Sequence, residues 1–198
     1  MDNQQILIAI VVLIIIILIV IGLWYMYSST DTTTSSQPSP DQQKLYELWG
    51  EHFLNIKLYA DAYLNNYSNV EEIKNKLYQT VVDIGTFFTI KYGKDIGDNI
   101  TKYLTDYINN LLLVLEAFKY NYSNLDDSQN KLYESAALFG SYLDGIFKTN
   151  DKYNKYMKMY TDTLLSNLLN TNIQNNIQTF YNYFGIGMRM VGDLALNF

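Results

Sequence analysis

The chain has 198 residues, a formal net charge of −6 and no cysteine. Because nucleic acids are bound through surfaces rich in Lys and Arg, an acidic chain without a basic patch argues against a nucleic-acid partner. The lack of cysteine excludes disulfide bonds and thiol chemistry. Tyr, Asn, Ile and Lys are abundant, a bias typical of AT-rich genomes such as those of large DNA viruses and low-GC bacteria.

The first predicted element is an apolar run, Ile6–Leu23, which contains no charge, no polar side chain and no proline. As a helix, about 20 residues cover the roughly 30 Å hydrocarbon core of a bilayer. Aromatic residues follow at positions 24, 25 and 27, as expected at the level of lipid headgroups. We therefore predict a transmembrane anchor at residues 1–27, which contacts the lipid bilayer through residues 6–27 and makes the chain a single-pass membrane protein.

A cleaved signal peptide is the alternative for this segment. It would need a basic start, a shorter apolar run and a cleavage site of small residues. The chain instead begins with Met1-Asp2-Asn3, and the region 24–27 is a poor cleavage site, so we favour a retained anchor. Neither flank carries nearby Lys or Arg, so the positive-inside rule leaves the orientation in a host, virion or envelope membrane undetermined.

Residues 28–43 are rich in Ser, Thr, Pro and Gln and offer no large apolar side chain to bury. They predict a flexible linker between the anchor and a domain at residues 44–198. Within this stretch, Ser39 followed by Pro40 fits an N-cap with proline at the first position of a helix.

Six amphipathic segments follow, each with apolar residues that repeat every three or four positions. They lie at about residues 45–63, 73–88, 100–118, 132–146, 153–168 and 173–194. Ser68 and Glu71 have the spacing of a capping box that opens the second segment, and Gly93-x-x-x-Gly97 is interpreted as a loop before the third. No segment keeps a two-residue period for long, so the sequence predicts an all-α fold.

An internal repeat runs through these segments. The motif Asn-Lys-Leu-Tyr at residues 75–78 recurs at residues 130–133, and each copy is followed by a glycine, Gly85 and Gly140. A weaker copy near residues 173–177 precedes Gly185 in the same way. We predict a six-helix bundle built from three pseudo-repeated helical hairpins, in which these mid-helix glycines allow close helix–helix approach. Chance similarity in a chain rich in Asn, Tyr and Leu is the alternative.

His52 is the only histidine. If the first two helices are antiparallel about a turn near Tyr67, His52 lies level with Asp83, and the third helix brings Tyr107 to the same height. The hypothesis is a buried cluster of His52, Asp83 and Tyr107, in which Asp83 orients the imidazole for acid–base work or metal binding. The alternative, which we favour, is a satisfied polar pair that fixes the register of the bundle.

Few other patterns indicate chemistry. The sequence offers no Ser-His-Asp or Cys-His spacing and no phosphate loop, so we predict no catalytic residue, no cofactor and no metal ligand. Three Asn-x-Ser/Thr triplets, which begin at Asn66, Asn99 and Asn121, are formal glycosylation acceptors, although a chain this rich in Asn yields a few by chance. The Tyr and Met residues at positions 153–160 are a further candidate, as a binding surface.

Several motifs follow one another along the domain: Leu48-Trp49-x-Glu51-His52, Gln79-x-x-x-Asp83-Ile84-Gly85, Tyr92-Gly93-x-x-x-Gly97 and the closing stretch Met190–Ala195. They resemble a family of small, mostly bacterial, all-helical proteins with no established activity. The resemblance covers about residues 45–198 and implies an all-helical fold. That family carries histidine at the positions of Tyr107 and Thr163, so this chain keeps only His52 of three histidines, and the resemblance implies no activity.

The sequence therefore predicts a single-pass, membrane-anchored helical bundle with a structural or binding role, such as a viral membrane or virion protein that meets a protein partner on its helical domain. A metal-dependent or acid–base enzyme with a site around His52 and Asp83 is the alternative.

Overall fold

A computed structural model describes the backbone of residues 37–169 and 173–198 and the side chains of residues 37–169 and 181–198. The predicted anchor, residues 1–27, and most of the predicted linker lie outside the described residues. None of the helices in the described part of the chain is both long and apolar enough to cross a bilayer. Residues Pro38–Phe198 form one compact unit.

The described residues form six helices and no strand, which confirms the all-α prediction. The helices are α2 (Pro40–Leu64), α3 (Val70–Tyr92), α4 (Lys94–Lys119), α5 (Leu125–Phe147), α6 (Lys152–Leu168) and α7 (Ile173–Ala195). Each corresponds to one of the six segments whose apolar residues repeat with the helical period.

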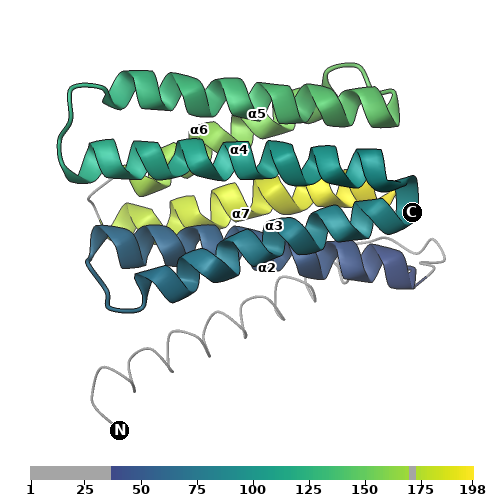
Figure 1. Ribbon diagram of the computed structural model, residues 1–198, viewed down its shortest axis with the longest axis horizontal. Helices are drawn as coiled ribbons and strands as arrows, with labels where there is room; N and C mark the ends of the chain where they lie inside the picture. Colours follow the sequence, from purple (N-terminus) through teal and green to yellow (C-terminus); the bar gives the residue numbers. More distant parts are fainter. Residues whose placement is uncertain (1–36, 170–172) are drawn as a thin grey trace, which may run out of the picture. The chain divides into compact units, whose positions relative to one another are not determined.

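The six helices form a closed ring. Helices that are consecutive in the chain pack side by side, and α7 packs back against α2. Figure 1 shows α3, α4 and α5 in one layer, with α2, α7 and α6 in the layer behind. The beginning of α2 and the end of α7 meet at one end of the bundle, where the Gln42 side chain donates to the Ala195 carbonyl at 3.0 Å. The α2–α3 and α4–α5 connections lie at the opposite end.

The start of α2 agrees with the predicted cap. Ser39 Oγ accepts a hydrogen bond from the Gln42 backbone N–H at 3.1 Å, and Gln42 Oε1 accepts one from the Ser39 N–H at 2.9 Å. This reciprocal pair is a capping box, with Pro40 at the first helical position. Residues 40–43, which the prediction placed in the linker, are therefore the first turn of α2.

The capping box predicted at Ser68 is wrong. The helix α3 begins at Val70 with Asn69 as its N-cap residue, and the Asn69 side chain makes no capping bond. An N-cap side chain reaches its own helix when the residue has extended backbone angles, whereas Asn69 has φ −97° and ψ 14°. The tight turn, closed by a 2.9 Å bond from the Tyr67 N–H to the Ala62 carbonyl, leaves Ser68 exposed between the helices.

The turns after α2 and α4 have the same geometry, 55 residues apart in the sequence. Asn66 and Asn121 adopt the left-handed conformation, with φ of 56° and 53°. In each turn the next backbone N–H, of Tyr67 or Tyr122, donates to the carbonyl five residues earlier at 2.9 Å. The helices that follow, α3 and α5, both have 23 residues. The sequence repeat is thus accompanied by a geometric one over α2–α3 and α4–α5.

Aromatic side chains fill the space enclosed by the six helices. The ring centroid of Phe53, on α2, lies 5.6 Å from that of Trp49, 5.0 Å from that of Tyr160 on α6 and 6.2 Å from that of Phe184 on α7. Gly187 of α7 makes room for Phe53, since a Cβ at this glycine would lie 2.5 Å from the phenyl ring. The abundance of aromatic residues in the sequence therefore serves, in part, to fill the space between six helices.

Glycines set the approach of α3 and α4. A Cβ on Gly97 would lie 2.6 Å from the Gly85 carbonyl oxygen, so the two helices cross where both residues lack a side chain. Gly97 lies inside α4, and its predicted placement in a loop is wrong. The connection between the two helices is Gly93 alone, whose φ of 92° is disfavoured for residues with a Cβ.

The equivalent glycine of the second hairpin, Gly140, makes the corresponding close approach to α6, where a Cβ would lie 2.5 Å from Asn154 Cα. Gly185 differs, because nothing lies within 4 Å of where its Cβ would be. The prediction that these glycines allow close helix–helix approach is therefore confirmed for Gly85 and Gly140 and wrong for Gly185.

A carboxylate at the end of α5 caps the next helix. Asp144 is 9 % exposed and accepts hydrogen bonds from the backbone N–H groups of Tyr153 and Asn154, at 3.0 and 3.1 Å, and from the Thr149 hydroxyl. The N-cap residue of α6 itself, Asp151, makes no side-chain cap. Asp144 therefore satisfies the free N–H groups that every helix N-terminus leaves.

We expect Asp144→Ala to lower the unfolding free energy of the domain by about 2 kcal/mol, because it removes a charged cap and leaves a buried Tyr153 N–H unpaired. Urea unfolding of residues 38–198 measures the change. The control is Asp106→Ala, which removes only a surface ion pair with Lys102 and should leave stability nearly unchanged. Equal effects of the two substitutions would contradict the capping role.

Candidate functional site

The only histidine lies inside the bundle and is paired with a threonine. His52 of α2 is 1 % exposed, and its Nδ1 lies 2.8 Å from the Thr80 hydroxyl of α3. The Thr80 hydroxyl lies 2.7 Å from the Leu77 carbonyl, which can only accept. The single hydroxyl proton therefore goes to Leu77, and the imidazole donates its Nδ1–H to Thr80.

Burial lowers the pKa of the His52 imidazole to about 3, because the charged form would lose its hydration. The ring lies edge-on to Trp49, with centroids 5.8 Å apart, and is tilted against Phe53 at 6.1 Å. His52 is therefore neutral at ordinary pH and surrounded by aromatic side chains.

The structure gives His52 a different partner from the predicted one. Asp83 is only partly buried, and its carboxylate accepts a hydrogen bond from the Gln79 side chain at 2.9 Å. In the observed register His52 of α2 lies beside Thr80 of α3, whereas the predicted register placed it beside Asp83, about one helical turn further along α3. A helical turn separates Thr80 from Asp83, so this small shift changes the partner from a carboxylate to a hydroxyl.

Tyr107 forms a second, separate pair. It is 1 % exposed, and its hydroxyl lies 3.1 Å from that of Thr161 on α6. Thr161 in turn donates to the Met157 carbonyl at 2.8 Å, so Tyr107 is the donor in the pair. Burial raises the pKa of the Tyr107 phenol above its ordinary range, and the bond with Thr161 offsets this only in part. Tyr107 is thus a neutral phenol inside the core.

The two pairs share one design. His52 and Tyr107 lie 55 residues apart, at the same place in the first and second hairpins, and each donates to a threonine that donates to a backbone carbonyl of its own helix. The three residues of the predicted cluster therefore do not meet. His52 and Tyr107 each form a separate pair in the core, and Asp83 makes a surface contact with Gln79. Sequence reasoning missed Thr80 and Thr161; their position on the apolar face of a helix is the signal that could have identified them.

The resemblance to the bacterial family marks a second position besides Tyr107, which is Thr163. Thr163 lies apart from these two core pairs. Its hydroxyl donates to the Met159 carbonyl of its own helix at 2.8 Å. The residue beside Tyr107 is Thr161, two positions earlier. Among the side chains of residues 37–169 and 181–198, no group of three or more His, Cys, Asp or Glu residues is arranged to hold a metal ion.

The Tyr and Met residues of α6 pack mostly into the core. Tyr153, Met157 and Tyr160 are each at most 2 % exposed, whereas Met159 is 48 % exposed. The Tyr160 hydroxyl is buried without a hydrogen-bond partner among the described residues. Its ring contacts Phe53, Tyr107 and Tyr183. Three residues of the predicted binding surface, Tyr153, Met157 and Tyr160, therefore lie in the core instead.

An open groove of about 510 Å³ lies between α5 and α6 on the outside of the bundle. It is lined by Asn130, Tyr133, Ala137, Asn154, Lys158 and Asp162. The Tyr133 hydroxyl donates to the Asp162 carboxylate at 2.7 Å. Burial, together with this bond, raises the pKa of Tyr133 to about 12. The groove combines amide, carboxylate and ammonium groups with an aromatic ring and an alanine side chain, so both polar and apolar atoms line it.

From Pro38 onward, the described residues and these contacts define a class: a closed, six-helix, all-α bundle whose core holds isolated polar pairs. Comparison of the chain with protein-family models, with curated proteins and with solved structures found no match. The resemblance indicated by the sequence motifs therefore stays a prediction.

Proposed function

We propose that the chain is a single-pass membrane protein whose folded part is a helical bundle with a structural or binding role. The observation that carries the structural or binding role is the bonding of His52, the chain's only imidazole, which is buried and paired with Thr80. A general acid or base must reach the proton that it transfers. A neutral imidazole among aromatic rings is better suited to fixing how α2 and α3 pack.

The proposal includes the anchor at residues 1–27 and an origin of the bundle in three pseudo-repeated hairpins. The run Ile6–Leu23 supports the anchor, because inserting so many aliphatic residues is favourable by something like 5–10 kcal/mol. The matched turns at Asn66 and Asn121 support the repeat for the first two hairpins. The composition supports a large DNA virus as the source, and a virion or host membrane as the location, with a bacterial envelope as the other candidate.

The groove between α5 and α6 supports a binding role. It presents polar groups from two helices, and Tyr133, Asp162 and Lys158 are arranged along it. A protein segment that offers both polar and apolar side chains fits this lining, and this is where we place the protein partner of the domain.

Extraction of membranes with alkaline carbonate tests the anchor. We expect the full chain to stay in the pellet and a Leu13→Arg/Ile16→Arg variant to be released, because each Arg at the centre of a membrane helix costs about 2.5–3.5 kcal/mol. Recovery of the unaltered chain in the soluble phase would reject the proposal.

Metal analysis of the purified chain distinguishes the proposed role from the enzymatic alternative. We expect no stoichiometric metal, and the same result for His52→Gln. A bound metal that disappears with His52→Gln would contradict a purely structural or binding role and would favour a metal-dependent site around His52 and Asp83.

A further inference from the structure

The two equivalent turns of the bundle carry the same four residues. Asn66-Tyr67-Ser68-Asn69 follows α2, and Asn121-Tyr122-Ser123-Asn124 follows α4. Each contains an Asn-x-Ser triplet, the acceptor for N-linked glycans. The third triplet of the domain, Asn99-Ile100-Thr101, lies inside α4. The structure therefore separates three chemically similar triplets into two turn sites and one helix site.

Both turn sites are accessible. Asn66, Ser68, Asn121 and Ser123 are all exposed, and each acceptor Asn lies in a left-handed turn between two helices. The Asn66 side chain accepts a hydrogen bond from the Lys119 ammonium at 2.7 Å through Oδ1. That contact leaves Nδ2 free, and Nδ2 is the atom that a glycan would occupy.

The helix site is tied into its helix. Asn99 uses Nδ2 itself to donate to the Asp95 carbonyl at 2.8 Å. Ile100 is fully buried, and the Thr101 hydroxyl donates to the Gly97 carbonyl at 3.0 Å, beside the close contact with Gly85. Asn99 is itself exposed, but its Nδ2 is bonded, and the other two residues of the triplet are held in the fold.

Exposed aromatic rings surround the turn sites. Tyr67, Tyr120 and Tyr122 are 51, 54 and 49 % exposed, and the rings of Tyr120 and Tyr122 stack with centroids 5.7 Å apart. Exposed apolar surface that is gathered in one place is typical of an interaction site. The C–H faces of sugar rings attached at the neighbouring Asn residues would pack on such rings.

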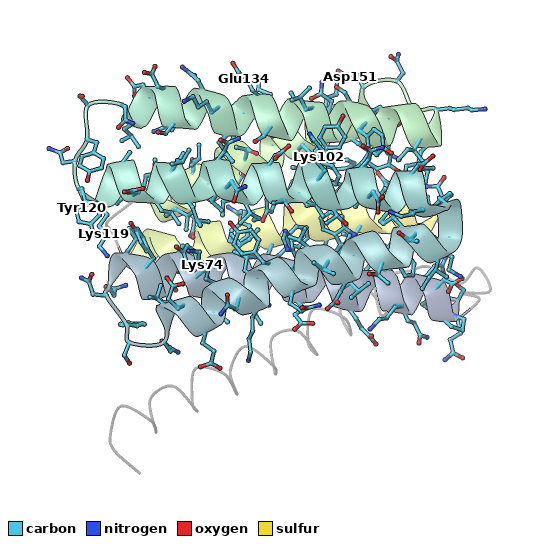
Figure 2. All side chains as sticks on the ribbon, in the orientation of Figure 1. Lys74, Lys102, Lys119, Tyr120, Glu134 and Asp151 are labelled. Atoms are coloured by element: carbon cyan, nitrogen blue, oxygen red, sulfur yellow. The ribbon has the colours of Figure 1, made fainter. Side chains whose placement is uncertain are left out.

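The turn sites lie far from where the chain enters the bundle. Figure 2 shows Lys119 and Tyr120 at one end, and Figure 1 shows the beginning of α2 and the C-terminus at the other. The 25 residues of α2 separate the two ends by roughly 37 Å, at about 1.5 Å for each residue. A bulky glycan at the turn sites would therefore lie at the end of the bundle away from the beginning of α2.

We propose that Asn66 and Asn121 carry N-linked glycans, that Asn99 does not, and that the helical domain faces the lumen or exterior of a eukaryotic host membrane. The donor is an oligosaccharide linked to a polyprenyl pyrophosphate. In the transfer, Asn Nδ2 forms a bond to the sugar C1, the C1–O bond to the pyrophosphate breaks, and the amide loses one proton. The inference rests on the proposed membrane anchor, because the anchor delivers the domain to the compartment where this transfer occurs.

The test is expression of the full chain in mammalian cells, followed by digestion with peptide-N-glycosidase F and electrophoresis. We expect a downward shift that corresponds to two glycans. Asn66→Gln and Asn121→Gln should each remove one, the double variant both, and Asn99→Gln none. Ser68→Ala and Ser123→Ala should each remove one glycan while keeping the Asn that the left-handed turn favours.

Carbonate extraction of the same cells separates this inference from the proposed function. A chain that stays in the membrane pellet without a shift, with only one glycan, or with a glycan at Asn99 would overturn the inference and leave the membrane-anchored bundle standing. A chain that is extracted into the soluble phase would overturn the proposed anchor. Two glycans on the membrane-bound chain would support both.

Discussion

At pH 5, relative to pH 7, the domain should lose about 2 kcal/mol more unfolding free energy than its His52→Gln variant. The pKa of His52 is about 3 in the folded chain and 6.5 in its ordinary state. Below pH 6.5 the unfolded chain binds a proton that the folded chain does not, so stability falls as pH falls, by about 1.4 kcal/mol for each pH unit. The loss ends near pH 3, where the folded chain also takes up the proton.

Urea unfolding of residues 38–198 at several pH values between 7 and 4 measures this difference. Gln at position 52 keeps a hydrogen-bond donor for Thr80 and does not titrate, so the carboxylates common to both proteins cancel in the comparison. Parallel stability curves would mean that the imidazole is solvated or protonated in the folded chain. Such a result would also remove the observation that carries the proposed function.

The helices and their number were predictable because they depend on local patterns. The period of the apolar residues identifies all six, and the N-cap at Ser39 follows from the Ser-Pro pair alone, although its reciprocal partner, Gln42, was not predicted. The failed cap at Ser68 shows the limit of such reasoning, because spacing does not tell which residue the chain uses to turn. Here the turn is closed by a bond from Tyr67 to Ala62, and the helix begins after it.

The partners of the site residues were not predictable, because they depend on register and on the arrangement of the helices. Identifying the partner of His52 required the register of α2 against α3 to be known to better than one helical turn. The predicted partner was Asp83, and the observed partner is Thr80, three residues earlier. Tyr107 reaches Thr161 on α6, a helix that is not its neighbour in the chain. Both helices, α4 and α6, pack against α5, so the contact depends on how three helices are arranged around one core.

A single added methyl group is expected to have a large effect at the crossing of α5 and α6. A Cβ on Gly140 would lie 2.5 Å from Asn154 Cα, 2.8 Å from Asn154 N and 2.9 Å from the Tyr153 carbonyl oxygen. These are backbone atoms, which cannot rotate away as a side chain could. The same stretch of α6 donates its N–H groups to Asp144, one turn after Gly140. The missing side chain at Gly140 is therefore what allows α6 to come close enough to be capped.

Gly140→Ala should lower the unfolding free energy by about 2 kcal/mol, because overpacking costs about 1–3 kcal/mol and the shift of α6 also weakens the cap. Gly145→Ala, on the same helix, should raise it by up to about 1 kcal/mol, since nothing lies within 4 Å of its Cβ and Ala is the better helix former. Urea unfolding of both variants of residues 38–198 shows directly whether each substitution lowers or raises the unfolding free energy. If Gly140→Ala were stabilising as well, helix propensity alone would explain both substitutions, and the glycine would not be setting the distance between α5 and α6.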